Sequence, residues 1–255
     1  MGLVRMVDAR LYFSDARTWR YMVGSIEKIV EEGVFVATGE GLSFRALDTS
    51  HVAMVDLFYP SSAFVEYEVS GKDSVEFGVS FELLAKVLRR ARKDDELVIE
   101  VDGEKLYVKL KSRGERVFKI PQIMLSYEKL PEPKISFTVR ARMLSSTFRE
   151  VVKDLEPHSE SITFKATDEA LLAVGRSDIA TAEIEMSVSR GSLLDFDAES
   201  NDKASYSIEY FSEMLSSAQA ADSVAIRFAE DAPVRVDMEY LGGGRLTFYV
   251  SPRLE

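Results

Sequence analysis

The chain has 255 residues, 46% of them hydrophobic, so it can bury a sizeable core in one large domain or two small ones. It has no cysteine, which excludes disulfides, thiol catalysis and thiolate metal sites. The formal net charge of −11 argues against an ordinary nucleic-acid binder, which is usually basic, so the direction in which the basic residues point becomes decisive. No apolar run approaches the length of about 18 residues that spans a membrane, and we expect a cytoplasmic protein that binds no membrane.

In chain order, the first half of the sequence predicts a strand, a helix, several strands, a second helix and three closing strands. Strands are predicted from apolar–polar alternation, and helices from apolar residues spaced three or four apart. The predicted elements are Ala9–Phe13, the helix Asp15–Val30, Val34–Ala37, Gly41–Ala46, His51–Leu57, a further strand, the helix Phe81–Ala91, Leu97–Val101, Lys105–Lys111 and Arg116–Ile120.

The second half of the sequence predicts the same order of elements. They include the strand Ile135–Val139, the helices Leu144–Leu155 and Tyr210–Ala218, and the strands Val224–Phe228, Val234–Tyr240 and Arg245–Val250. Asp102-Gly103 and Gly242-Gly243-Gly244 join predicted strands, so they are interpreted as hairpin turns and not as phosphate loops.

The two halves are an internal repeat with a period of about 128 residues. Phe35–Leu42 matches Phe164–Leu171, with Phe, Ala, Thr, Glu and Leu at equal positions. The apolar pattern of Leu84–Ile99 recurs in Phe211–Ile226. The sequence therefore predicts an α+β protein of two similar β-rich domains, each with two helices.

A proline-bearing segment separates the two repeats. Pro121, Pro131 and Pro133 lie within it, and proline removes backbone donors and fixes φ, so we expect an extended connector. The predicted organisation is an N-terminal domain over residues 1–119, an interdomain connector over 120–134 and a C-terminal domain over 135–255.

Basic residues lie opposite the apolar arcs of three predicted helices. The apolar arcs comprise Trp19, Met22, Val23, Ile26, Ile29 and Val30; Leu83, Leu84, Val87, Leu88 and Ala91; and Phe148, Val151, Val152 and Leu155. The basic residues are Arg17, Arg20 and Lys28 in the first helix, Lys86, Arg89, Arg90 and Lys93 in the second, and Arg142, Arg149 and Lys153 in the third. In the fourth helix the corresponding positions carry no positive charge. A surface of this kind favours a polyanion, most simply a nucleic-acid backbone bound without reading bases.

Three other interpretations stay open at this point. His51 could act as a catalytic base oriented by Asp48 or Asp56. The acidic run Asp94–Glu96 could hold a metal ion, although a solvated turn is the simpler interpretation. The cluster Lys86–Lys93 could be a nucleic-acid patch on a monomer.

Two segments carry a resemblance to a known family. Leu47–Leu57 (LDTSHVAMVDL) resembles the central-loop segment of the proliferating cell nuclear antigen (PCNA) sliding clamps, and Gly244–Glu255 (GRLTFYVSPRLE) resembles their C-terminal ending. The similarity extends over essentially the whole chain, and its length is like that of archaeal clamps. It implies a closed trimeric ring with helices lining the hole, acting as a DNA polymerase processivity factor that encircles duplex DNA.

The resemblance also implies surfaces for assembly and for DNA. Glu115–Ile120 of one chain would pair with Asp178–Met186 of the next, since unpaired strand edges tend to find partners. The basic residues named above would face the hole and contact phosphates weakly, as a sliding ring requires.

A peptide-docking pocket beneath the connector is implied as well. It would hold a glutamine followed by aliphatic and paired aromatic residues, carried by DNA polymerase, flap nuclease, DNA ligase and clamp loader. The matching positions are Leu47, His51, Val52, Met54, Ile123, Leu125, Leu130, Ala232, Pro233, Ser251 and Pro252.

The family resemblance implies no catalytic residue, no metal and no cofactor, and a location on the nucleoid. A homotrimer and a heterotrimer with paralogues are both compatible with the sequence. The alternatives are one subunit of a heterotrimeric or checkpoint-type clamp, or a metal-dependent DNA-processing enzyme that uses the clustered carboxylates.

Overall fold

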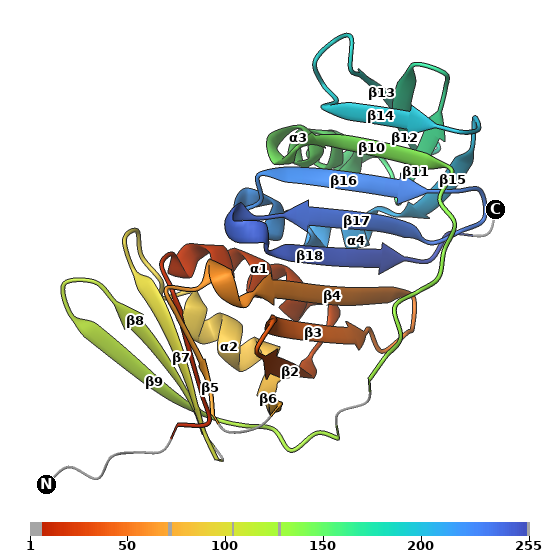
Figure 1. Ribbon diagram of the computed structural model, residues 1–255. Helices are drawn as coiled ribbons and strands as arrows, with labels where there is room; N and C mark the ends of the chain where they lie inside the picture. The colour runs from red at the N-terminus through yellow and green to blue at the C-terminus, as the bar shows by residue number, and fades with distance from the viewer. Residues whose placement is uncertain (1–6, 71–72, 104, 127–128, 254–255) are drawn as a thin grey trace, which may run out of the picture. The chain divides into compact units, whose positions relative to one another are not determined.

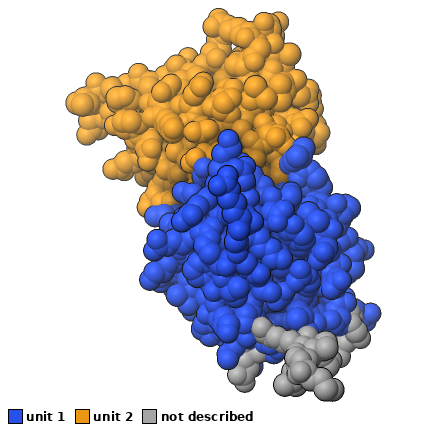
Figure 2. All heavy atoms as spheres, turned by 90° about the vertical axis from the view of Figure 1, so that its left-hand side faces the viewer, with its two compact units in different colours: residues 1–46, 56–130, 241–244 blue, residues 47–55, 131–240, 245–255 orange. Residues whose placement is uncertain are grey.

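The computed structural model describes residues 7–70, 73–103, 105–126 and 129–253 (Figure 1). The chain divides into two compact units, coloured separately in Figure 2. Unit 1 comprises residues 1–46, 56–130 and 241–244, and unit 2 comprises residues 47–55, 131–240 and 245–255. Residues 127–128 of the predicted connector, and Leu254 and Glu255 of the C-terminal run, lie outside the described residues.

Unit 1 contains two sheets and two helices. One sheet has the order β5-β1-β7-β8-β9 and the other contains β4-β3-β2-β6. The bounds are β1 Ala9–Phe13, α1 Ala16–Ile29, β2 Glu32–Thr38, β3 Gly41–Leu47, β4 Ala53–Pro60, β5 Glu66–Val69, β6 Ser74–Ser80, α2 Phe81–Leu88, β7 Glu96–Asp102, β8 Lys105–Lys111 and β9 Glu115–Pro121. The core lies between these layers and the helices, with Trp19, Tyr59 and Phe81 among its largest fully buried side chains.

Unit 2 repeats this plan. Its sheets have the orders β14-β10-β16-β17-β18 and β13-β12-β11-β15. The bounds are β10 Val139–Leu144, α3 Ser145–Leu155, β11 Ser161–Ala166, β12 Ala170–Arg176, β13 Thr181–Ser187, β14 Asp195–Ala198, β15 Lys203–Ser207, α4 Ile208–Glu213, β16 Ser223–Phe228, β17 Val234–Glu239 and β18 Arg245–Val250. Figure 1 shows α3 packed behind β10 and β16.

Local sequence explains where the helices begin. The Asp15 carboxylate accepts a hydrogen bond from the backbone N–H of Arg17, and Ser80 Oγ accepts one from Leu83 N, so both helices of unit 1 have a side-chain N-cap. The predicted apolar arc of α1 is buried in full. Within the described residues, no helix is long and apolar enough to cross a membrane.

The structure corrects three sequence-based expectations. The strand predicted at Ile135–Val139 is instead β10, which starts at Val139 opposite Phe228, where its neighbour β16 ends. Leu83, predicted in the core, is exposed, because Phe81 and Ala85 are buried and turn the apolar face of α2 away from it.

The predicted fourth helix, Tyr210–Ala218, is the third correction. Helix α4 spans only Ile208–Glu213 and is followed by a 3₁₀ turn at Ser217–Gln219. The Ser217 hydroxyl donates to the carbonyl of Met214 at 2.8 Å. Such a side-chain bond to the backbone competes with the regular helical pattern.

Candidate functional site

Helices α1 and α2 pack against each other in unit 1. Helix α2 ends at Leu88 and not at Ala91 as predicted, so Lys86 lies on it, whereas Arg89, Arg90 and Lys93 follow its end. Arg20 Nη1 donates to the carbonyl of Ala91, just beyond α2, at 3.4 Å, and its guanidinium lies over the Tyr21 ring. Arg89 Nη1 lies 2.6 Å from Glu27 Oε1, which links the end of α2 to α1. Arg20 and Arg89 thus each reach from one of the two helical segments to the other.

The charges of these two helical segments are not equally available. Asp15 pairs with Arg17 and Glu27 pairs with Arg89, so each arginine carries a local counter-charge. Of the basic residues predicted to face DNA in this part of unit 1, those that are exposed and have no ion-pair partner among the described residues are Lys28, Lys86, Arg90 and Lys93. The chain as a whole has a net charge of −11, so this group of cations stands out as a site that can bind phosphate.

The corresponding segments of unit 2 carry fewer cations. Arg149 and Lys153 lie on α3, half-buried and exposed respectively, whereas the exposed face of α4 carries Glu209. Arg142, predicted on the third helix, lies instead in β10. Its neighbours Ala141 and Met143 are buried, so Arg142 points to the opposite face of the sheet, where it binds Glu239 and Ser223.

Strands β9 and β13 are edge strands of their respective sheets. Along β9 the exposed side chains include Val117 and Lys119, whereas Phe118 is half-buried. Along β13, Glu183 is exposed and Ile184 is half-buried. Both edges thus combine an apolar residue with charge, basic on β9 and acidic on β13, and both leave backbone groups open to pairing.

The first part of the predicted connector runs along β6 in unit 1. Ile123 N donates to the carbonyl of Gly78 at 3.0 Å. A Cβ on Gly78 would lie only 2.1 Å from the Ile123 carbonyl oxygen, so glycine is needed for this close approach. Ile123 is half-buried, and Met124 and Leu125 are exposed, which leaves apolar side chains at the surface beside a fixed backbone.

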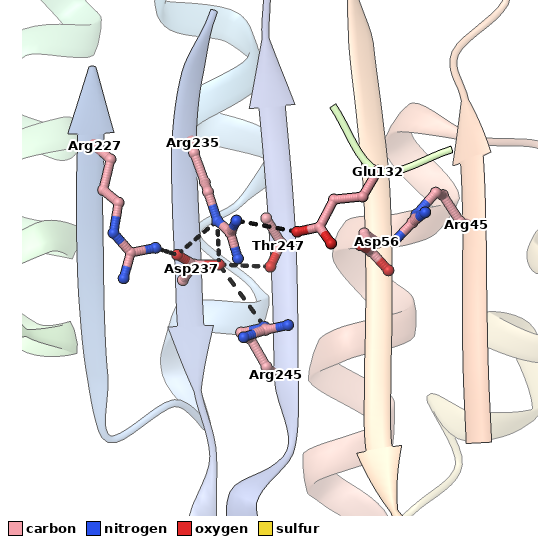
Figure 3. Close-up of polar contacts among 8 residues, drawn as sticks. All are labelled: Arg45, Asp56, Glu132, Arg227, Arg235, Asp237, Arg245 and Thr247. Carbon is pink, nitrogen blue, oxygen red and sulfur yellow. Dashed lines mark hydrogen bonds and ion pairs between the residues drawn. The ribbon is translucent and has the colours of Figure 1, made fainter. Parts of the chain in front are cut away.

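Arginines hold the later part of the connector. In unit 1, Arg45 Nη1 donates to the carbonyl of Leu130 at 2.9 Å. The Nη2 atom of the same arginine pairs with Asp56 at 2.6 Å (Figure 3). In unit 2, Arg235 Nη1 lies 3.3 Å from Glu132 Oε1.

Arg235 belongs to a network centred on the fully buried Asp237 (Figure 3). Both oxygens of Asp237 lie 3.0 Å from Arg235 Nε, Thr247 donates to Oδ1 at 2.6 Å, and Arg227 also donates to this carboxylate. Burial lowers the pKa of Arg235, but the charge and hydrogen bonds of Asp237 outweigh it and raise that pKa above its ordinary value.

The loop that follows β3 is organised by Asp48 in unit 2. Its carboxylate accepts hydrogen bonds from Val52 N at 2.8 Å, Ala53 N at 2.9 Å and the Tyr210 hydroxyl at 2.8 Å. Burial raises the pKa of Asp48, but these bonds and one from Ser50 outweigh it and hold the pKa below its ordinary value. His51 has a φ of 58° at the exposed tip, so the loop is held in a conformation that few side chains adopt.

The other expected docking residues of unit 2 lie around this loop and the C-terminal segment. Ser251 N donates to the carbonyl of Val52 at 2.9 Å, which joins the two segments. Met54 is buried, whereas the remaining ones are partly exposed: Leu47, Val52, Ala232, Pro233, Ser251 and Pro252. The docking role of these residues, and of Ile123, Leu125 and Leu130 in unit 1, stays a prediction.

The contacts of Asp95 bear on the metal interpretation of Asp94–Glu96. Asp95 is fully buried and binds Arg116 and the backbone N–H of Arg92. Hydrogen bonds from Arg92 and Arg116 lower the pKa of Asp95 although burial opposes them. In the part of the chain that the structure describes, no three potential ligands gather as a metal site.

Comparison with known proteins decides the family. Residues 6–126 match the N-terminal domain, and residues 129–253 the C-terminal domain, of proliferating cell nuclear antigen. DNA polymerase sliding clamp 3 of Aeropyrum pernix is 77% identical over 250 residues, covering 98% of this chain and 100% of that protein. The chain belongs to the PCNA family of sliding clamps.

Other PCNA relatives agree in sequence and structure. The DNA polymerase sliding clamp of Thermofilum pendens is 41% identical over 96% of this chain and 99% of its own length. PCNA of Thermococcus kodakaraensis superposes with a TM-score of 0.90 at 30% identity, covering 96% of this chain and all of that one. The same values hold for a chain in the PCNA2–PCNA3 complex of Sulfolobus tokodaii. The α+β fold with two repeated domains is thereby confirmed.

Proposed function

We propose that this clamp closes into a trimeric ring that encircles duplex DNA through its helix layers and tethers a DNA polymerase by a docked peptide. The observation that carries the proposal is that Lys28, Lys86, Arg90 and Lys93, which have no ion-pair partner among the described residues, lie on or just after α1 and α2 in an acidic chain. Contacts of this kind bind phosphates weakly and without sequence preference, which allows sliding. Retention on DNA then comes from topology, and the clamp performs no chemistry of its own.

A topological experiment tests this function. Without a loader, a closed ring threads over a free end but does not pass onto a circle. Addition of the clamp is therefore expected to lengthen the products of its replicative polymerase on a primed linear template and not on the same template circularised. Equal stimulation of both templates would contradict encirclement.

The DNA-facing layer makes a second prediction. The double variant Lys86→Ala with Arg90→Ala is expected to shorten processive products about two- to fivefold, because each lost cation removes a phosphate contact. The variant Lys105→Ala with Arg113→Ala removes the same charge from exposed positions at the start of β8 and just after its end, and serves as the control. If both variants reduce synthesis equally, the loss reflects net charge and the layer is not the DNA surface.

Ring closure is proposed to join β9 of one copy to β13 of the next. Phe118 and Ile184 would pack together, and Lys119 would meet the acidic Glu183, so this chain complements a second copy of itself. The homotrimer is our proposal. A heterotrimer with paralogues is the alternative, favoured by the PCNA2–PCNA3 complex among the similar structures. DNA ligase, flap nuclease and clamp loader are proposed partners of the same docking site.

The solution mass tests the assembly. Light scattering of the purified chain is expected to give three times the mass of 28.6 kDa per chain. The variant Ile184→Asp is expected to have the mass of a single chain, since a buried charge at the pairing edge is costly. Leu241→Asp is the control, because Leu241 is 84% exposed and lies outside both pairing segments. A wild-type monomer that assembles only with paralogues would overturn the homotrimer.

A further inference from the structure

A polar trough of about 530 Å³ lies on the solvent face of the β13-β12-β11-β15 sheet, within unit 2. Its floor consists of small side chains, where Thr163 Oγ1 and Ser205 Oγ lie 2.8 Å apart beside Val174. Basic residues border it at both ends, Lys165 and Lys203 at one and Arg176 and Arg253 at the other. The family residues discussed above do not include this floor.

The basic end of the trough brings two lysines of neighbouring strands face to face. Lys165 on β11 lies directly opposite Lys203 on β15 in the antiparallel register. Like charges at such positions repel and destabilise a sheet. Lys165 has neither an ion pair nor a side-chain hydrogen bond to any residue in the described ranges.

The large sheet of the same unit shows how this chain relieves the same conflict. Arg227 lies directly opposite Arg235, and the carboxylate of Asp237 binds both (Figure 3). The trough places Lys165 and Lys203 in the same relation without a carboxylate in contact with Lys165. Its geometry therefore resembles that of the Asp237 network, with room beside Lys165 for a carboxylate of another molecule.

The spacing of the cations indicates the shape of that molecule. Lys165 lies opposite Leu172, and Arg176 is four residues further along β12, which at a rise of about 3.3 Å per residue separates the two ends by about 13 Å. One phosphate group is too small to reach both ends. Carboxylates four residues apart on an extended peptide match the distance.

The lining also argues against a nucleic-acid strand. Bases of single strands stack on aromatic rings, and the residues that line the trough include none. Glu183 lies at its border and would repel a continuous polyanion, whereas a peptide can place a neutral residue there.

We infer that the trough binds an extended acidic peptide segment, with one group of carboxylates at Lys165 and Lys203 and another at Arg176 and Arg253. Arg253 N donates to the carbonyl of Ser205 at 2.8 Å, so the segment that follows β18 borders the trough. Ser251 and Pro252 of that segment are expected docking residues. We take the peptide to be the flank of a protein that is docked on the clamp, and this source rests on the proposed function. The charge pattern of the trough does not depend on it.

The test uses labelled peptides without a docking motif, so that failure of the docking site cannot affect it. The probe is a peptide of about ten Glu, Ser and Gly residues with glutamates four positions apart. The control peptide has Gln in place of every Glu. Binding to the full-length clamp is measured by fluorescence polarisation at low ionic strength. Inorganic phosphate and a labelled thymidine oligonucleotide are measured alongside.

The acidic peptide is expected to bind and its Gln version not to. The variant Lys165→Ala with Arg176→Ala should weaken binding about three- to tenfold, as expected for two exposed charge pairs. Lys105→Ala with Arg113→Ala, equal in charge, should stay within about twofold of the parent. Lys165→Ala alone should leave the melting temperature unchanged or raised, because it removes the repulsion from Lys203.

Three outcomes would overturn the inference. They are equal binding of the Glu and Gln peptides, equal weakening by the trough and control variants, and tighter binding of the oligonucleotide or phosphate than of the acidic peptide. A lower melting temperature for Lys165→Ala would show that Lys165 has a structural partner and would also contradict it. Each is independent of the linear-versus-circular template result, so failure here is distinguishable from failure of the clamp function.

Discussion

Replacement of Asp237 by alanine is expected to lower the melting temperature of the clamp by about 6–12 °C. The change leaves Arg227 and Arg235 facing each other with no carboxylate between them, and breaking a buried ion pair costs about 3 kcal/mol or more. For a chain of this size, each 1 kcal/mol corresponds to about 2–4 °C. The measurement is thermal unfolding followed by circular dichroism.

Asp197→Ala provides the matched control for this prediction. Asp197 lies on β14 of the same sheet, is exposed, and pairs with Arg140 at a distance of 4.0 Å. An exposed pair of this kind contributes about 0–1 kcal/mol, so its loss should shift the melting temperature little. Asp237→Asn keeps the size and removes only the charge. Equal effects of Asp237→Ala and Asp197→Ala would show that the network does not stabilise the unit.

Gly78→Ala is expected to weaken binding of a docking peptide at least about tenfold, equivalent to about 1.4 kcal/mol, while the fold is kept. The new Cβ would lie 2.1 Å from the carbonyl oxygen of Ile123, which must move away together with the connector that carries Leu125. The probe is a labelled peptide with a glutamine followed by aliphatic and paired aromatic residues, titrated by polarisation.

Gly39→Ala is the control for the connector. Gly39 lies in the same unit, and a Cβ there meets no atom within 4 Å. Leu125→Ser removes an exposed apolar side chain without moving the backbone, and it should weaken binding of the same peptide. Unchanged titrations for both Gly78→Ala and Leu125→Ser would show that the connector does not contact the peptide.

The repeat and the amphipathic patterns predicted most of the fold. Trp19, Ile26 and Phe148 are buried as the helical spacing indicates, because a strong apolar arc has one way to leave water. Boundaries were harder to predict. Phe137 and Val139 alternate equally well, yet β10 begins at Val139, since strand ends depend on a pairing partner that lies far away in the sequence.

The polar networks of the candidate sites could not be predicted from sequence. Asp48 meets Tyr210 across 162 residues, and Arg45 meets the backbone of Leu130, contacts that no local pattern encodes. The predicted strand Val234–Tyr240 contains Asp237, but nothing in its pattern shows that Asp237 is buried and bound to both Arg235 and Arg227. The basic arcs of α1 and α2 were predicted, whereas the counter-charges of Asp15 and Glu27 were not.

The division of the chain into units has a consequence for synthesis on the ribosome. Unit 1 includes Leu241–Gly244, whose Gly242 and Gly243 have φ of 83° and 86° and whose Gly244 lies against the ring of the buried Tyr59. Tyr59 is translated early and Gly244 very late. The N-terminal repeat therefore cannot complete its core while the chain is growing, and cleavage at the connector would release a first half that lacks its last piece.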